Sequence, residues 1–212
     1  MKKNNIIITV GRQFGSGGRE LGKLLAERFG IDYYDKKLLI EGARQAGMSQ
    51  EYFENRDEKM PSFLGGMISP WVSANPSAWY AGMCYGTDDT TYGYQCDVIR
   101  KAADKGSCVI VGRSANYVLR DYANTVNIFV HAPIETCAER IVARGDAKSI
   151  DEAVTKAKKI NKLRSNYYNF YTDKEWGDAA SYDLTFDSSK ISMENAVEVI
   201  RLYIKLRFGI EI

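Results

Sequence analysis

A glycine-rich segment, Gly11 to Glu20, constrains the fold more than any other feature of this 212-residue chain. It directly follows Ile6 to Val10, a β-branched run that is typical of a buried parallel strand. It precedes an apolar stripe at helical spacing, formed by Leu21, Leu24, Leu25 and Phe29. Gly30 then provides a helix C-terminal cap. This order of strand, glycine loop and helix predicts an α/β protein, because a parallel strand is normally followed by a helical crossover.

The chemistry of the loop points to an anion. Four of its first eight residues are glycine: Gly11, Gly15, Gly17 and Gly18. Successive backbone N–H groups can therefore turn inward on a phosphate, at the positive end of the following helix. The alternative is a tight turn that needs glycine only for its backbone. A dinucleotide fingerprint fits poorly, because its third glycine would fall at Glu20. The strict pattern G-x-x-x-x-G-K-[ST] also fails, because Gly18 occupies the lysine position and Arg19 occupies the Ser/Thr position.

Composition excludes several classes of protein. The 29 Lys and Arg residues against 27 Asp and Glu give a net charge of +2, which argues against a nucleic-acid partner. One histidine, His131, and four cysteines without C-x-x-C spacing argue against structural zinc. A chain of this length needs no disulfides for a core, so we expect reduced thiols and a cytoplasmic protein. The run Ile6 to Val10 is too short for a signal peptide or a membrane span, which predicts a soluble single domain without a membrane partner.

Strand and helix patterns alternate along the rest of the chain. Further strands are expected at 31–35, 108–111, 126–130 and 182–186, and helices at 36–47, 96–105, 133–144, 149–168 and beyond 190. Five strands interleaved with helices predict an open three-layer α/β sheet that binds ligands at the carboxyl ends of its strands.

Residues 59–93 break this alternation, and nine of the 25 aromatic residues lie between Tyr52 and Tyr94. They suit a nucleobase slot, a homodimer surface or a small satellite core.

Six stretches carry a combined family signature: Ile8–Glu20, Tyr33–Lys36, Val109–Arg113, Lys162–Tyr168, Trp176–Asp178 and Tyr182–Leu184. Together they resemble the cytidylate kinase-like family over nearly the whole chain. The resemblance implies the nucleoside monophosphate kinase fold, a P-loop kinase with a five-stranded parallel sheet, and it implies ATP and Mg²⁺ as cofactors. It divides the single domain, residues 1–212, into a core (1–35, 94–135 and 180–212), an acceptor-binding insertion (about 36–93) and a lid (about 140–170). Cytidylate kinases carry a P-loop lysine, which this chain lacks.

The donor phosphates are then assigned to the loop itself, with Arg12, Gly15, Ser16, Gly17, Gly18 and Arg19 as binding residues. Arg19 is the nearest replacement for the missing lysine, because a guanidinium can contact two phosphate oxygens at once; its alternative is an exposed arginine at a helix start. Arg12 is a second contributor or a surface residue. Ser16 is the only hydroxyl in the loop and a candidate Mg²⁺ ligand, although it precedes the usual ligand position.

The resemblance places three residues at the acceptor. Asp35 would orient the acceptor or hold metal-bound water, or would act instead as a helix N-cap. Arg113 matches the arginine of a G-R-D motif and is predicted to bind the acceptor phosphate, with a surface ion pair as the alternative. Arg44 would add a second contact, although cytidylate kinases carry their arginine six residues after the aspartate, where Glu41 stands.

Residues 140–164 hold eight basic residues against three acidic ones. In the resembling kinases this region is the lid, and its arginines close over the transferring phosphoryl group. We therefore assign catalytic roles to Arg140, Arg144 and Arg164, together with Arg19 and Asp35. The alternative is a solvated basic helix face, which accounts for Lys156 and Lys159.

The sequence predicts an ATP-dependent kinase of a nucleoside monophosphate, and the resemblance makes CMP or dCMP the acceptor. Two alternatives stay open. A nucleotide-binding regulator or pseudokinase would keep the phosphate loop and lose transfer. A kinase of a non-nucleotide metabolite would keep the chemistry and change the acceptor.

Overall fold

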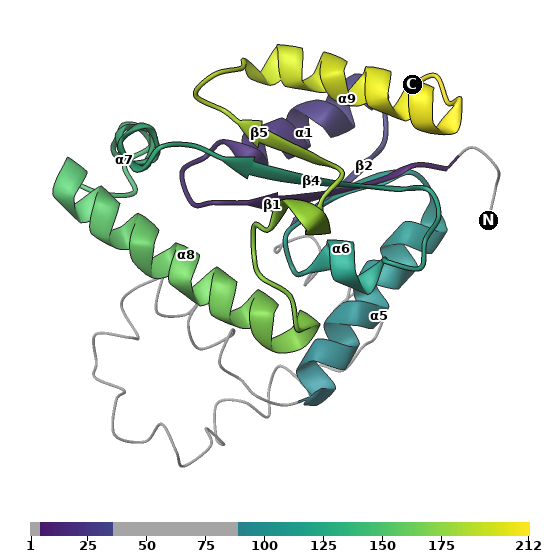
Figure 1. The fold of residues 1–212 in the computed structure, drawn as a ribbon, viewed down its shortest axis with the longest axis horizontal. Coiled ribbons are helices and arrows are strands. Elements are labelled where there is room, and N and C mark those ends of the chain that lie inside the picture. The colour runs from purple at the N-terminus through teal and green to yellow at the C-terminus, as the bar shows by residue number, and fades with distance from the viewer. Residues whose placement is uncertain (1–4, 36–88) are drawn as a thin grey trace.

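The structure is a computed structural model that describes residues 5–35 and 89–212. The described residues form a five-stranded, fully parallel sheet with strand order β2-β3-β1-β4-β5, which Figure 1 shows between layers of helices. The strands are β1 (Ile7–Arg12), β2 (Asp32–Tyr34), β3 (Cys108–Val111), β4 (Thr125–His131) and β5 (Leu184–Asp187). This confirms the predicted α/β fold.

Helices cover both faces of the sheet (Figure 1). In chain order they are α1 (Gly18–Phe29), α5 (Asp89–Lys105), α6 (Ala115–Val118), α7 (Ile134–Ala143), α8 (Ile150–Thr172) and α9 (Met193–Phe208), with a 3-10 turn, η2 (Ala179–Ser181), before β5. In the described part of the chain no helix is both long enough and apolar enough to cross a bilayer.

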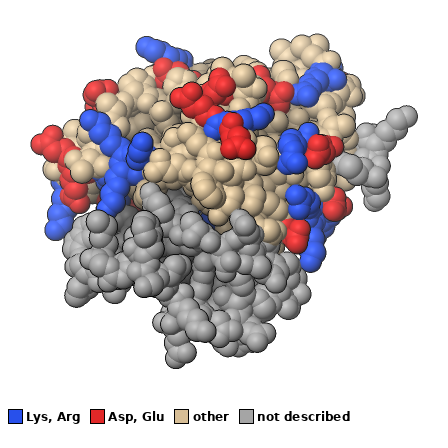
Figure 2. Space-filling model, turned by 60° about the horizontal axis from the view of Figure 1, so that its bottom comes forward, with Lys and Arg blue, Asp and Glu red and all other residues tan. Residues whose placement is uncertain are grey.

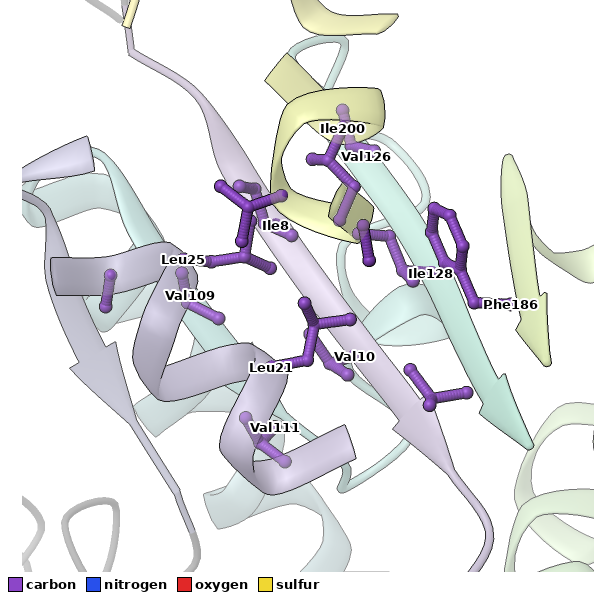
Figure 3. Close-up of a cluster of buried hydrophobic side chains, with 14 of the residues drawn as sticks. Ile8, Val10, Leu21, Leu25, Val109, Val111, Val126, Ile128, Phe186 and Ile200 are labelled. Carbon is purple, nitrogen blue, oxygen red and sulfur yellow. The ribbon is translucent and has the colours of Figure 1, made fainter. Parts of the chain in front are cut away.

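The side chains of β1 alternate between the two faces of the sheet, and both faces are apolar. Ile8 and Val10 point to the layer of α1 and α9, where they meet Leu21, Leu25 and Ile200 (Figure 3). Ile7 points the other way and packs with α5 and α6. Successive side chains of a strand lie on opposite faces, so a strand covered on both sides must be apolar throughout. β1 is the central strand, and its carboxyl end leads directly into the glycine loop.

Several element boundaries differ from the sequence expectations. α5 begins at Asp89 and α8 extends to Thr172, so both helices are longer than predicted. The start of α8 is as expected: the Ser149 hydroxyl accepts a hydrogen bond from Glu152 N at 3.2 Å. Glu152 Oε2 in turn accepts from Lys148 N at 2.8 Å, one residue before the cap. The expected helix at 36–47, with Arg44, lies outside the described residues, as does most of the insertion at 36–93.

Charged side chains of both signs are mixed on the described part of the face shown in Figure 2. The basic segment at 140–164 is distributed over α7, α8 and the loop between them. Arg144 is paired there with Asp146 at 3.1 Å and, across to α1, with Glu20 at 3.2 Å. The Arg144 side chain therefore links α7 to the start of α1 through a solvent-exposed ion pair.

Candidate active site

The glycine loop joins β1 to α1 in a conformation that requires glycine at two positions. Gly15 and Gly17 have φ of 84° and 81°, in the left-handed region. A Cβ on Gly15 would also lie 2.7 Å from the backbone oxygen of Cys137 in α7. Gly17 is the N-cap of α1, so the loop delivers its backbone to the positive end of that helix. This geometry suits an anion and is the one that phosphate loops use.

Ser16 holds the loop against the sheet. Its hydroxyl lies 2.9 Å from the carbonyl oxygens of both Gln13 and Val130, to which it donates, and the residue is 1% exposed. A hydroxyl that is buried and directed at carbonyl oxygens does not suit a magnesium ion, which requires oxygen ligands facing the nucleotide. The described residues also contain no cluster of three His, Cys, Asp or Glu side chains that could hold a metal. The role of Ser16 as an Mg²⁺ ligand therefore stays a prediction, and its hydroxyl would have to leave these carbonyl oxygens to reach the ion.

Ser188, directly after β5, ties the loop to α7. Its hydroxyl donates to Ser16 O at 2.7 Å and accepts from Arg140 Nη1 at 2.8 Å. Arg140 Nη2 also donates to Ser188 O at 2.9 Å. A Cβ on Gly17 would lie 3.6 Å from Arg140 Nη1, so this guanidinium stands beside the loop glycine. Sequence reasoning found Arg140 and missed Ser188, because nothing in a serine after a strand indicates a contact across the sheet.

Phe14 connects the loop to α8. Its N–H donates to Asn161 Oδ1 at 2.8 Å, and the guanidinium carbons of Arg144 and Arg164 each lie 5.7 Å from the centre of its ring. Both distances are within the range of a cation–π contact. Arg164 Nη1 further donates to Arg12 O at 2.9 Å. The structure therefore brings the three predicted lid arginines to the loop: one through Ser188 and two around Phe14.

Arg19 and Asp35 form an ion pair between the first turn of α1 and the end of β2. Arg19 Nη2 lies 2.7 Å from Asp35 Oδ2, and their side chains are 54% and 12% exposed. Burial acts to lower the pKa of Arg19, but the hydrogen bond and the charge of Asp35 outweigh it and raise that pKa. Tyr33 lies nearby, and burial together with the charge of Asp35 raises its pKa. Arg19 is thus charged and held by Asp35 beside the loop.

The turn after β3 carries Arg113 in an uncommon backbone conformation. Gly112, Arg113 and Ser114 have φ of 79°, 62° and 51°, three left-handed residues in succession. Such strain in non-glycine residues persists where surrounding structure enforces it, and it concentrates at functional sites. Arg113 Nη1 donates to Gln95 Oε1 at 3.4 Å, and that oxygen also accepts from Tyr167 OH at 3.0 Å. Gln95 of α5 therefore links the turn to α8.

A pocket lies at the carboxyl ends of β1 and β3, under α8. Three of its lining residues are the arginines Arg12, Arg113 and Arg164. The pocket is also lined by polar and aromatic residues, namely Asn116, Tyr167, Tyr168, Trp176 and Tyr182. Burial raises the pKa of the Tyr182 hydroxyl, which therefore stays protonated. Guanidinium groups bind phosphate and aromatic rings stack on planar bases, so this set of lining residues suits a ligand that combines the two.

The stretch Trp176 to Asp178 has a structural explanation. The Trp176 ring meets Phe129 edge-on, with 5.3 Å between ring centres, and Gly177 has a φ of 86°. A Cβ on Gly177 would lie 3.2 Å from the same phenylalanine ring. The Asp178 carboxylate caps η2 by accepting from Ala180 N at 3.2 Å. These residues shape the wall of the pocket that Trp176 lines.

Comparison with known proteins agrees with this architecture. The family model described as "Cytidylate kinase-like family" matches residues 7–190. The chain is 29% identical to a cytidylate kinase of Pyrococcus horikoshii over 95% of this chain and 89% of that protein. It is similar to a solved structure of an uncharacterized protein from Eubacterium ventriosum, with a TM-score of 0.70 and 30% identity, covering 95% of this chain and 99% of that one. A shikimate kinase from Acinetobacter baumannii shares the fold alone, with a TM-score of 0.51 and 13% identity over 96% of this chain and 95% of that one. The chain belongs to the cytidylate kinase-like family.

Proposed function

We propose that this protein transfers the γ-phosphoryl group of ATP to a nucleoside monophosphate, with CMP or dCMP as the acceptor. The single observation that carries the proposal is the pocket beside the glycine loop, which is lined by Arg12, Arg113 and Arg164 together with aromatic side chains. The identity to a cytidylate kinase over 95% of this chain supports the acceptor class. The division of the chain into a core, an acceptor-binding insertion and a lid stays a prediction.

Phosphoryl transfer requires mainly positioning and charge stabilisation, which fits a site built from arginines and backbone amides. The loop from Gly15 to Arg19 would hold the donor phosphates through backbone N–H groups at the start of α1. Arg113 would bind the acceptor phosphate, and Asp35 would orient the acceptor from the end of β2. Arg140, Arg144 and Arg164 would stabilise negative charge and exclude water. Mg²⁺ would travel with ATP and keep mostly phosphate and water ligands.

Steady-state kinetics test this proposal directly. The purified protein is supplied with ATP, Mg²⁺ and one nucleoside monophosphate at a time, and ADP release is followed by a coupled assay. We expect turnover with CMP and dCMP above all other acceptors. Arg113→Met should raise the acceptor KM at least tenfold and leave the KM for ATP within twofold, because one charge-assisted contact to the acceptor is lost. Arg120→Met removes an exposed charge outside this pocket and is the matched control.

A regulator that binds nucleotide without transfer is the second candidate, and Gly18 in place of the lysine favours it. ATP binding measured by calorimetry, together with no turnover for any nucleoside monophosphate, would establish that alternative. Turnover with a phosphate-free hydroxyl acceptor would instead indicate a metabolite kinase.

A further inference from the structure

Arg12 lies between two glycines that make room for it. A Cβ placed on Gly18 would be 2.5 Å from Arg12 Cβ and 3.1 Å from its Cγ. A Cβ placed on Gly112 would be 1.7 Å from Arg12 Nη1 and 2.7 Å from its Cζ. No side chain fits at either glycine while Arg12 keeps this conformation. The aliphatic part of Arg12 therefore lies on the first residue of α1, and its guanidinium lies on the turn after β3.

The positions of Arg12 and Gly18 in the phosphate-loop pattern are informative. If Gly17 is the second glycine of G-x-x-x-x-G-K, the first glycine falls at position 12 and the lysine at position 18. The chain has Arg12 and Gly18 there, so the glycine and the basic residue have exchanged places. The 2.5 Å separation explains the exchange, because the two Cβ positions overlap and only one can carry a long side chain.

We propose that Arg12 replaces the P-loop lysine and binds the outermost phosphate of ATP; the proposal rests on the ATP site of the proposed function. Its side chain starts over the position where the lysine would start, beside Val130 and the first turn of α1. Its guanidinium extends to Gly112, along the wall of the pocket that Arg113 and Arg164 also line. That position lies between the donor loop and the acceptor turn, where a transferred phosphoryl group must pass.

Arg12 fits this role better than Arg19. The Arg19 guanidinium is directed at Asp35, at 2.7 Å, and its side chain is 54% exposed. The main chain of Arg12 is fixed by β1, and its carbonyl oxygen accepts from Arg164 Nη1 at 2.9 Å. A guanidinium can also hold two oxygens of one phosphate, whereas an ammonium group acts as a point charge.

ATP and ADP binding by calorimetry tests the proposal without requiring turnover. Arg12→Met keeps the aliphatic part that packs on Gly18 and removes the charge. We expect its ATP affinity to fall at least tenfold and its ADP affinity less than threefold, because the outermost phosphate loses its contact. Arg12→Lys should lie between Met and the natural protein. Arg28→Met, at the exposed far end of α1, removes an equal charge and should change neither affinity. An ATP affinity of Arg12→Met within twofold of the natural protein would overturn the proposal.

The exchange itself is tested by reversing it. Arg12→Gly alone should lose ATP affinity at least tenfold, and Gly18→Lys alone should lose affinity because its Cβ collides with Arg12. The double variant, R12G with G18K, restores the standard pattern and should bind ATP at least fivefold more tightly than Arg12→Gly. A double variant no better than Arg12→Gly would contradict the exchange. Thermal unfolding of each variant confirms that the fold is retained.

The two proposals fail in different ways. Natural protein that binds ATP but phosphorylates no acceptor refutes the proposed transfer, while the Arg12 variants still decide the role of Arg12. Natural protein that binds no ATP refutes both.

Discussion

Arg19 Nη2 and Asp35 Oδ2 lie 2.7 Å apart, so the first turn of α1 is joined to the end of β2 on the side of the sheet where ligands of α/β proteins bind. The pair connects two residues that sequence reasoning assigned separately, Arg19 to the donor and Asp35 to the acceptor. Because the Arg19 side chain is more than half exposed, the pair contributes less than about 1 kcal/mol to folding stability. Its importance should therefore appear in kinetics.

Asp35→Asn keeps the shape of the side chain and removes its charge. We expect kcat/KM for the acceptor to fall at least tenfold and the free energy of unfolding to change by less than about 1 kcal/mol. Steady-state kinetics and urea unfolding measure the two effects. If Asp35 acts only by holding Arg19, the double variant with Arg19→Ala should be no slower than Arg19→Ala alone. An additive loss would assign Asp35 a direct contact with the acceptor.

Ser188→Ala tests the tie between β5, the loop and α7. The variant leaves Ser16 O and Arg140 each without one hydrogen-bond partner in a region where Ser188 is 6% exposed. We expect a loss of about 1–3 kcal/mol in the free energy of unfolding, measured in urea. Ser189→Ala removes an adjacent, exposed hydroxyl that donates to Asp187, and should cost less than about 0.5 kcal/mol. Equal losses of unfolding free energy in the two variants would show that the hydrogen bonds of Ser188 do not stabilise the fold more than an exposed serine does.

Ser188 also illustrates what the sequence could and could not predict. The strand, loop and helix from Ile6 to Gly30 were predictable, because an apolar β-branched run, a set of glycines and a helical stripe are local patterns. The contact of Ser188 with Ser16 joins residues 172 positions apart, and no local pattern encodes it. The hydrogen bond from Ser16 to Val130 could not be predicted for the same reason, because Val130 belongs to another strand.

The arginines show the same limit at the site. Residue type and position after a strand were enough to select Arg113, which lines the pocket at the carboxyl ends of β1 and β3. The arrangement of Arg12 depends on the space left by Gly18 and Gly112, two residues that only the tertiary structure brings to its side chain. The sequence offers Arg19 as the nearest replacement for the missing lysine and Arg12 as a second contributor. In the structure, the side chain of Arg12 occupies the space beside Gly18 where that lysine would begin.

Replacing each of three glycines by alanine should distinguish backbone strain from steric collision. At Gly30 no atom lies within 4 Å of the new Cβ, so only the left-handed φ of 62° disfavours alanine. Gly30→Ala should therefore lower the free energy of unfolding by about 1–2 kcal/mol. Gly17→Ala adds contact with the mobile end of Met193, at 2.3 Å, and should cost slightly more. Gly15→Ala meets the backbone oxygen of Cys137 at 2.7 Å, which cannot move without α7. Urea unfolding should rank the losses in this order, with Gly15→Ala the largest, and any other order would contradict the loop geometry.

Gln95→Leu should weaken acceptor binding without affecting ATP. Gln95 Oε1 accepts from both Arg113 and Tyr167, so leucine releases Arg113 from the position that faces the pocket. We expect the acceptor KM to rise threefold to tenfold and the ATP affinity to stay within twofold, measured by kinetics and calorimetry. Gln95→Glu retains an acceptor oxygen for Arg113 and should recover part of the loss. A change in ATP affinity equal to the change in acceptor KM would indicate general disruption of α5 instead.

The buried thiol of Cys108 should make the folded protein less stable at alkaline pH. Burial, with a smaller contribution from the charge of Asp32, raises the pKa of this thiol from 9.0 to about 12. Below pH 9 the thiol is protonated in the folded and unfolded chains alike, and its contribution to stability is fully present. Between pH 9 and about 12 only the unfolded chain ionises, which favours unfolding by up to about 1.4 kcal/mol per pH unit. Cys108→Ala removes this ionisation, so its free energy of unfolding under reducing conditions should fall less steeply over that range. Parallel curves for the variant and the natural protein would mean that Cys108 titrates normally in the folded state and is accessible to water.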